Sequence, residues 1–104
     1  MISYFVVKGQ SMEPYCGEGD FVISVPYFFS CLKAGDIVVL QHPKSDIAIV
    51  KRITSASRNG YWVQGDNKQE SSDSRSFGWI PRKSILGRAK VIHRPHLLTS
   101  SIIK

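Results

Sequence analysis

The sequence predicts an all-β domain built of short, mostly antiparallel strands. β-branched and aromatic residues recur in six short runs, and clusters of Gly, Pro, Asn, Asp and Ser separate these runs. No segment keeps a helical period over about ten residues. The chain has 104 residues, of which 42% are hydrophobic, enough for one modest core. We therefore expect a single β-domain over residues 1–94 and a C-terminal tail over residues 95–104.

The expected strands cover residues 4–8, 21–25, 36–41, 47–53, 61–64 and 85–93. Turn-forming residues fill the breaks at 17–20, 34–36, 43–46, 58–60 and 65–67. Pro14 should end the first strand region, with one helical or 3-10 turn over residues 11–13. The aromatic run at residues 27–29 is expected in the core, the alternative being an exposed lip that contacts a membrane or a hydrophobic leader.

The strand predicted over residues 47–53 carries a lysine on its apolar side. Because side chains alternate along a strand, Lys51 shares a face with Ile49 and Ile53. Burial disfavours the charged ammonium, so the pKa of Lys51 should fall toward the range that a general base needs. The commoner alternative is that the lysine stem follows the apolar surface and the amine reaches water.

A serine stands where the first strand should turn. Ser11 follows the apolar run of residues 4–7, which makes it a candidate nucleophile. A serine hydroxyl is a weak nucleophile and needs a base within hydrogen-bond reach. Lys51 is the best candidate for that base.

Residues 65–75 form a polar segment that contains Asp66, Asn67, Ser71, Asp73 and Arg75. Taken alone, such a segment is an ordinary surface loop in which Asx and Ser side chains bond their own backbone. In a functional reading, Asp73 and Arg75 pair in bidentate fashion, and the Ser71 hydroxyl orients the lysine amine.

Charge and cysteine content exclude several classes of site. The net charge is +6, but Lys and Arg are scattered with no run longer than two, which favours a solvated basic surface over a nucleic-acid site. Cys16 and Cys31 match no metal-ligand spacing and leave a single disulfide open, and the histidines lie at no zinc-site spacing. We therefore expect no metal, no cofactor and no nucleic-acid partner.

The sequence contains no apolar run near the roughly 20 residues that cross a bilayer, and no signal-peptide pattern. The expected location is cytoplasmic. Peripheral membrane contact, or membrane association through a partner, stays open.

Four short motifs follow one another along about 70 residues. They are Gly-Gln-Ser-Met-Glu-Pro at 9–14, Gly-Asp-Ile-Val-Val at 35–39, Val-Lys-Arg-Ile at 50–53, and Gly-Asp-Asn at 65–67 with Ser71, Asp73-Ser74-Arg75 and Phe77-Gly78 after it. In this order they resemble the type I signal peptidase family, peptidase family S26. The resemblance implies a small, partly barrel-like β-fold shared with LexA-like repressors, and peptidase activity through a Ser/Lys dyad.

The same resemblance implies individual roles. Ser11 would be the nucleophile, Lys51 the general base, and Met12 would pack beside them. Five further residues would support the site: Ser71 by positioning the lysine, Asp66, Asp73 and Arg75 by holding the surrounding structure, and Asn67 beside them.

The chain also departs from the family pattern. The usual N-terminal membrane anchor is not in the sequence, and only residues 52–64 separate Lys51 from Gly65, so the large inserted domain of many members is missing. Some members place a hydroxyl for the oxyanion hole two residues before the nucleophile, where this chain has Gly9, followed by Gln10. Backbone amides, chiefly that of Ser11, are expected to take this role.

The predicted function is a serine endopeptidase that cleaves a leader or signal-type peptide from a precursor protein. Among small anchorless members, the chain resembles the maturation proteases of nickel-type superoxide dismutase. A LexA-like self-cleaving relative is one alternative, but such proteins are not expected to carry the Gly-Asp-Asn block. A second alternative is a non-catalytic β-module that binds peptides or proteins. A third is a basic nucleic-acid binder, which the scattered positive charge disfavours.

Overall fold

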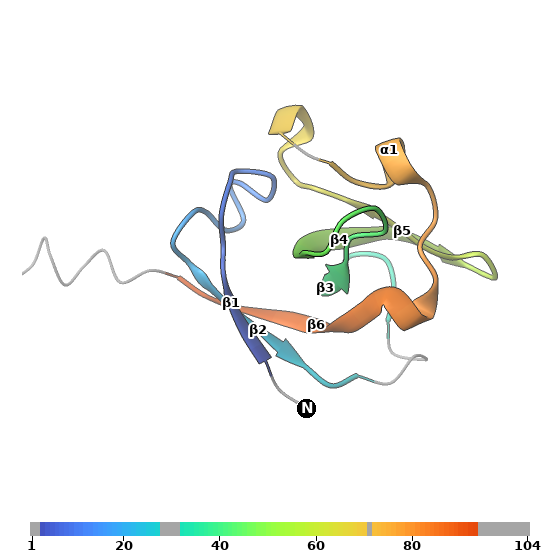
Figure 1. The fold of residues 1–104 in the computed structure, drawn as a ribbon, viewed down its shortest axis with the longest axis horizontal. Coiled ribbons are helices and arrows are strands. Elements are labelled where there is room, and N and C mark those ends of the chain that lie inside the picture. Colours follow the sequence, from blue (N-terminus) through green and yellow to red (C-terminus); the bar gives the residue numbers. More distant parts are fainter. Residues whose placement is uncertain (1–2, 28–31, 71, 94–104) are drawn as a thin grey trace, which may run out of the picture.

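One six-stranded antiparallel sheet forms the body of the protein (Figure 1). The structure is a computed structural model that describes residues 3–27, 32–70 and 72–93. The strand order is β1-β2-β6-β3-β4-β5. The strands are β1 (Ser3–Val6), β2 (Phe21–Val25), β3 (Ile37–Gln41), β4 (Ala48–Ser57), β5 (Gly60–Gln64) and β6 (Ile85–Ile92).

The prediction of an all-β fold is confirmed, and each expected strand has an observed counterpart. The helical elements are short: η2 (Lys68–Glu70), α1 (Ser74–Phe77) and η3 (Arg82–Ser84). The expected turn after the first strand is present, because Glu13 N–H donates to Gln10 O at 3.2 Å and Cys16 N–H donates to Met12 O at 3.2 Å. The sequence resemblance also implied a partly barrel-like sheet. The sheet is not closed, since β1 and β5 stand at opposite ends of the strand order.

β4 runs four residues beyond its predicted end at residue 53. Its last residues are exposed and pair with β5 in a long hairpin, with Ala56 opposite Tyr61 and Ser57 opposite Gly60. Gly60 has a positive φ of 111°, which L side chains rarely adopt. The hairpin therefore depends on turn geometry and backbone pairing rather than on apolar alternation.

The largest apolar cluster lies between β3, β4, β5 and the segment before β6. It consists of Leu32, Val38, Leu40, Ile53, Tyr61, Val63, Ile80 and Ile85. Tyr27 packs against this cluster and its hydroxyl donates to Ile85 O at 3.1 Å. Phe28 and Phe29, which were expected in the core, lie outside the described residues.

A second, smaller cluster joins the loop after β1 to the sheet. Met12, Cys16 and Ile37 form its buried centre, and Val7 and Val50 pack against it. Because two of its members come from the loop, this cluster fixes the segment that contains Ser11.

Candidate active site

Apolar anchors hold the segment around Ser11 in place. Met12 and Cys16 are buried on either side of the turn, while Ser11 itself is half-buried. Before the turn, Gly9 adopts a positive φ of 83°, and its amide donates to the Glu18 carboxylate at 3.2 Å. The chain can therefore reverse direction here and leave the serine at the surface of the small cluster.

A long-range backbone contact ties Ser11 to the Gly-Asp-Asn motif. Asn67 N–H donates to Ser11 O at 2.8 Å, although 56 positions separate the two residues in the sequence numbering. The Asn67 side chain accepts a bond from Gln69 N–H at 3.2 Å and so shapes the start of η2. The Ser11 segment and the Gly-Asp-Asn motif are thus joined through the main chain.

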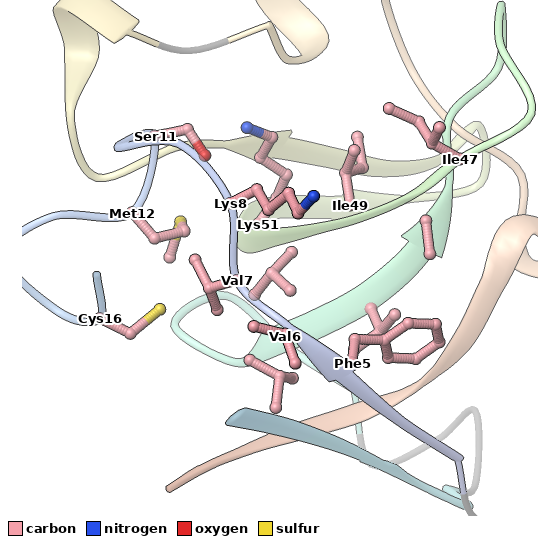
Figure 2. Close-up of a pocket in the computed structure, with 14 residues that line it drawn as sticks. Phe5, Val6, Val7, Lys8, Ser11, Met12, Cys16, Ile47, Ile49 and Lys51 are labelled. Carbon is pink, nitrogen blue, oxygen red and sulfur yellow. The ribbon is translucent and has the colours of Figure 1, made fainter. Parts of the chain in front are cut away.

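Ser11 and Lys51 line the same pocket, which has a volume of about 310 Å³. Residues 5–8 and the Ser11 loop form one wall, residues 47–51 form the other, and Val22 and Val39 complete the lining. Figure 2 shows both polar side chains at one end of this pocket, with Met12 beside Ser11. The Ser11 hydroxyl makes no hydrogen bond with another described residue.

Lys51 is buried, with only 3% of the residue exposed. Burial is the main reason why the pKa of its amine lies below the ordinary value, and the nearby charge of Arg75 lowers the pKa further. The Asp73 carboxylate opposes both effects by stabilising the ammonium. The alternation argument therefore identified a buried lysine whose pKa lies below the ordinary value.

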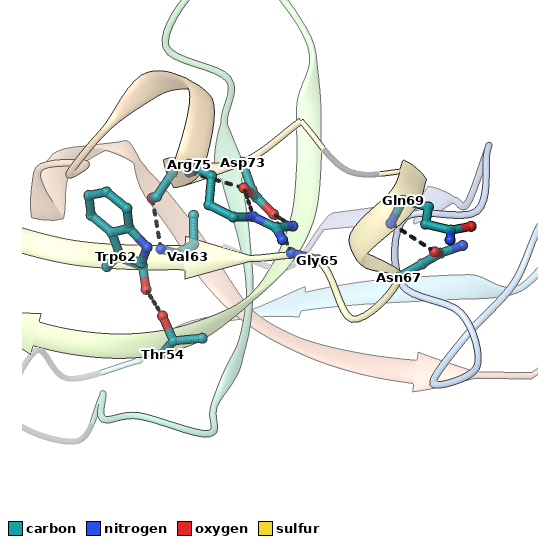
Figure 3. A network of polar contacts seen from close by, with 9 residues as sticks. Thr54, Trp62, Val63, Gly65, Asn67, Gln69, Asp73 and Arg75 are labelled. Atoms are coloured by element: carbon teal, nitrogen blue, oxygen red, sulfur yellow. Dashed lines mark hydrogen bonds and ion pairs between the residues drawn. The ribbon is translucent and has the colours of Figure 1, made fainter.

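Asp73 and Arg75 pair as expected (Figure 3). Arg75 Nε donates to Asp73 Oδ1 at 3.0 Å and Nη2 donates to Oδ2 at 2.6 Å, a bidentate contact. The fully buried Asp73 side chain also accepts bonds from the amides of Gly65, at 2.9 Å, and Arg75, at 3.1 Å. One carboxylate thus joins the end of β5 to the start of α1.

Sequence reasoning missed Arg52, the neighbour of Lys51 on the opposite face of β4. Its guanidinium donates to both Asp66 oxygens, at 2.9 and 2.8 Å, and to Gly35 O at 3.1 Å. The Arg52 guanidinium also lies over the Tyr15 ring, 5.3 Å from the centroid. The Asp66 carboxylate is therefore connected to β4 through Arg52. The sequence signal that could have identified Arg52 was strand alternation, which puts Arg52 on the face of β4 opposite Lys51.

Two strand edges that have no neighbouring strand within the described residues line this pocket. β1 is an edge strand, and β4 pairs with β3 from Ala48 onward but meets β5 only from Arg52. Val7 bonds toward the β2 side, because its N–H donates to Asp20 O and its carbonyl accepts from Gly19 N–H. Since antiparallel strands alternate these directions, Val6 and Lys8 turn their backbone groups to the open edge.

The remaining predicted site residues are not among those that the structure places in the pocket lining. Gly9 and Gln10 are exposed and lie outside the pocket lining, and Ser71 falls outside the described residues. Cys16 is a free, buried thiol whose pKa is raised by burial, and Cys31 is not among the described residues.

Residues 3–27, 32–70 and 72–93 contain no cluster of three or more potential metal ligands. Within the same residues, no helix is long and apolar enough to cross a membrane.

Comparison with known proteins gives a consistent result. The family model described as signal peptidase, peptidase S26, matches residues 1–57 and 54–94. The chain is 32% identical to mitochondrial inner membrane protease subunit 1 of Xenopus tropicalis, with 80% of this chain and 64% of that protein covered. It is 34% identical to the human protein of the same name, with 78% and 63% covered.

A second kind of relative is the signal peptidase complex catalytic subunit SEC11C of Homo sapiens. The identity is 32%, over 82% of this chain and 48% of that protein. The chain thus spans between about half and two thirds of the length of these relatives.

Proposed function

Because the chain belongs to the signal peptidase family, peptidase S26, we propose that it is a serine endopeptidase that removes a leader or signal-type peptide from a precursor protein. Ser11 is the nucleophile and Lys51 the general base. The observation that carries this proposal is the shared pocket, in which a half-buried hydroxyl stands with a buried lysine whose pKa is lowered. A lysine must be neutral to accept a proton, and burial favours that form.

The open edges of β1 and the first half of β4 provide a place for the substrate. An extended peptide lying between them would bond to both through main-chain groups, and the apolar lining of the pocket would receive its side chains. The pocket floor is formed by medium-sized apolar residues, which suits small or aliphatic substrate side chains. The precursor would bind as an added strand, with its scissile bond beside Ser11.

The reaction then follows from the two side chains. Lys51 Nζ takes the proton of Ser11 Oγ, Oγ attacks the scissile carbonyl carbon, and the resulting ammonium returns the proton to the leaving nitrogen. A water molecule, deprotonated by the same amine, then attacks the acyl carbon, the bond from that carbon to Ser11 Oγ breaks, and the ammonium returns its proton to Oγ. The Ser11 amide supplies one donor for the oxyanion, while the Gly9 amide is already bonded to Glu18.

Ser11→Ala and Lys51→Met should each abolish cleavage of leader-bearing precursors, because each removes one half of the dyad. The expected loss is at least about a thousandfold in kcat/KM, measured by mapping the new N-terminus by mass spectrometry. Ser55→Ala, on the exposed part of β4, is the matched control and should cleave normally. Undiminished cleavage by either dyad variant, with folding intact by circular dichroism, would refute this mechanism.

A narrower proposal is that the precursor is a nickel-type superoxide dismutase. It is supported by the short connection between Lys51 and Gly65, formed by the β4–β5 hairpin, and it is tested by offering that precursor beside unrelated leader-bearing proteins. Equal cleavage of all these precursors would support a general leader peptidase and contradict a specific role in superoxide dismutase maturation.

A non-catalytic peptide-binding module is the second candidate. It is favoured by one observation, namely that the Ser11 hydroxyl has no hydrogen bond within the described residues. In that case wild type and Ser11→Ala would bind peptides equally and neither would cleave them.

A further inference from the structure

One charged side chain on the pocket wall has no role in the proposed reaction. Among the described residues that line the pocket, Lys8 and Lys51 are the basic ones, and none is Asp or Glu. Most of the remaining lining is apolar. The electrostatic character of the pocket therefore depends on its two lysines.

The two lysines differ in their surroundings. Lys51 is buried and has a lowered pKa, whereas Lys8 is exposed. Figure 2 shows the Lys8 side chain extending across the pocket toward Ile49, away from Ser11. Lys8 thus supplies a positive charge above an apolar floor, where nearby low-dielectric walls reduce screening.

Nothing in the described part of the chain neutralises this charge by direct contact. Lys8 takes part in no ion pair between described residues. The Glu18 carboxylate bonds to the amide of Gly9, next to Lys8 in the chain, and Glu18 is not among the described residues that line the pocket. A substrate carboxylate entering the pocket would be the direct partner of Lys8.

We propose that Lys8 forms an anion-selecting subsite, so that preferred substrates carry Asp or Glu close to the cleaved bond. Ser11 follows Lys8 by three positions in the sequence, a span of at most ~11 Å in extended chain. The acidic side chain therefore lies within about three residues of the scissile bond. This inference rests on the proposed function, since it names the substrate class of the same pocket.

The test uses sets of three peptides that are identical except for Glu, Gln or Lys at one position within three residues of the cut. The cut is first mapped in a peptide library with the wild-type protein. We expect cleavage, as kcat/KM, to favour Glu over Gln by about two- to fivefold at low salt, and the preference to shrink as salt rises. Lys8→Glu should reverse the order, with the Lys peptide preferred over the Glu peptide.

Lys90→Glu is the matched control. It makes the same change in net charge on β6, where Lys90 is exposed opposite Ile23 and outside the pocket lining. This variant should keep the wild-type order of the three peptides. A reversal in Lys90→Glu as well would show that overall charge, and not Lys8, sets the preference.

Binding of the same peptides to Ser11→Ala, measured by fluorescence anisotropy, separates this inference from the proposed function. Ser11-dependent cleavage with equal rates for all three peptides, at every position tested, would overturn the subsite and leave the peptidase. Absence of cleavage by wild type, with Glu peptides still bound more tightly than Lys peptides, would overturn the peptidase and leave the subsite. Equal binding without cleavage would overturn both.

Discussion

At the scale of single residues, Lys51 combines opposing influences. Burial and the charge of Arg75 lower the pKa of the amine, while the Asp73 carboxylate raises it. Asp73 is itself occupied by a bidentate contact with Arg75 and by two backbone amides. Because much of its charge is compensated in this way, Asp73 does not overcome the effect of burial on Lys51.

The proposed reaction should therefore depend on pH in one direction. Lys51 is active when neutral, so kcat/KM should rise with pH, by about tenfold per unit on the acid side. The rise should level off below the ordinary lysine value of 10.5, because the pKa is lowered. A pH series with one peptide, accompanied by circular dichroism to confirm folding at each pH, checks this. A flat profile between about pH 6 and pH 9 would contradict the role of Lys51.

Individual side chains in the site were partly predictable from the sequence. Strand alternation placed Lys51 on a buried face without any knowledge of the partner strands, because the period of two needs only local information. The Asn67–Ser11 hydrogen bond was not predictable in this way, since it joins backbone groups of distant segments. Lys8 was also missed, because a lone lysine after a strand gives no signal until the opposite wall of the pocket is known.

At the scale of elements, strand positions were predicted well where apolar and polar residues mark them. The predicted end of β4 was wrong because residues 54–57 are exposed and mostly polar, so that only their pairing with β5 makes them a strand. Whether the sheet would close into a barrel was not predictable from the sequence either. It depends on which strands become edges, and that order follows from tertiary packing rather than from any one segment.

The β4–β5 hairpin offers a test of element stability at Gly60. A Cβ atom at this position would collide with the Ile80 carbonyl oxygen, which accepts the Tyr61 amide at 2.9 Å. Gly60→Ala should cost about 2–4 kcal/mol of unfolding free energy, measured by urea denaturation. Gly35→Ala is the matched control. It has a similar positive φ of 100° but nothing within 4 Å of the added atom, so only the backbone strain of about 1 kcal/mol should appear.

At the scale of the whole molecule, the pocket exists because the sheet curves. β1 and β4 are separated by three strands in the sheet order, yet residues of both line one pocket. The contact from Asn67 to Ser11 links the loop after β1 with the segment after β5, the two ends of the same sheet. The proposed active site thus depends on the complete sheet and would be lost on partial unfolding at either edge.

Peptide binding between the two open edges should leave a pattern in amide exchange. With Ser11→Ala and a saturating peptide, the amides of β1 and of residues 48–51 should exchange about tenfold more slowly. β5 is the other edge strand and serves as an internal control, since its exchange should not change. Protection of β5 in place of β1, seen by hydrogen-exchange mass spectrometry, would show that the peptide is added at the wrong edge.

In the proposed binding mode, the two open edges would also determine which proteins can become substrates. A substrate segment that binds between β1 and the first half of β4 needs free main-chain N–H and C=O groups on both of its edges. A segment already in a helix or inside a sheet has used those groups and cannot enter. The domain would therefore distinguish unfolded stretches from folded ones before any side chain is recognised, and a precursor would be cut only while its leader lacks structure of its own.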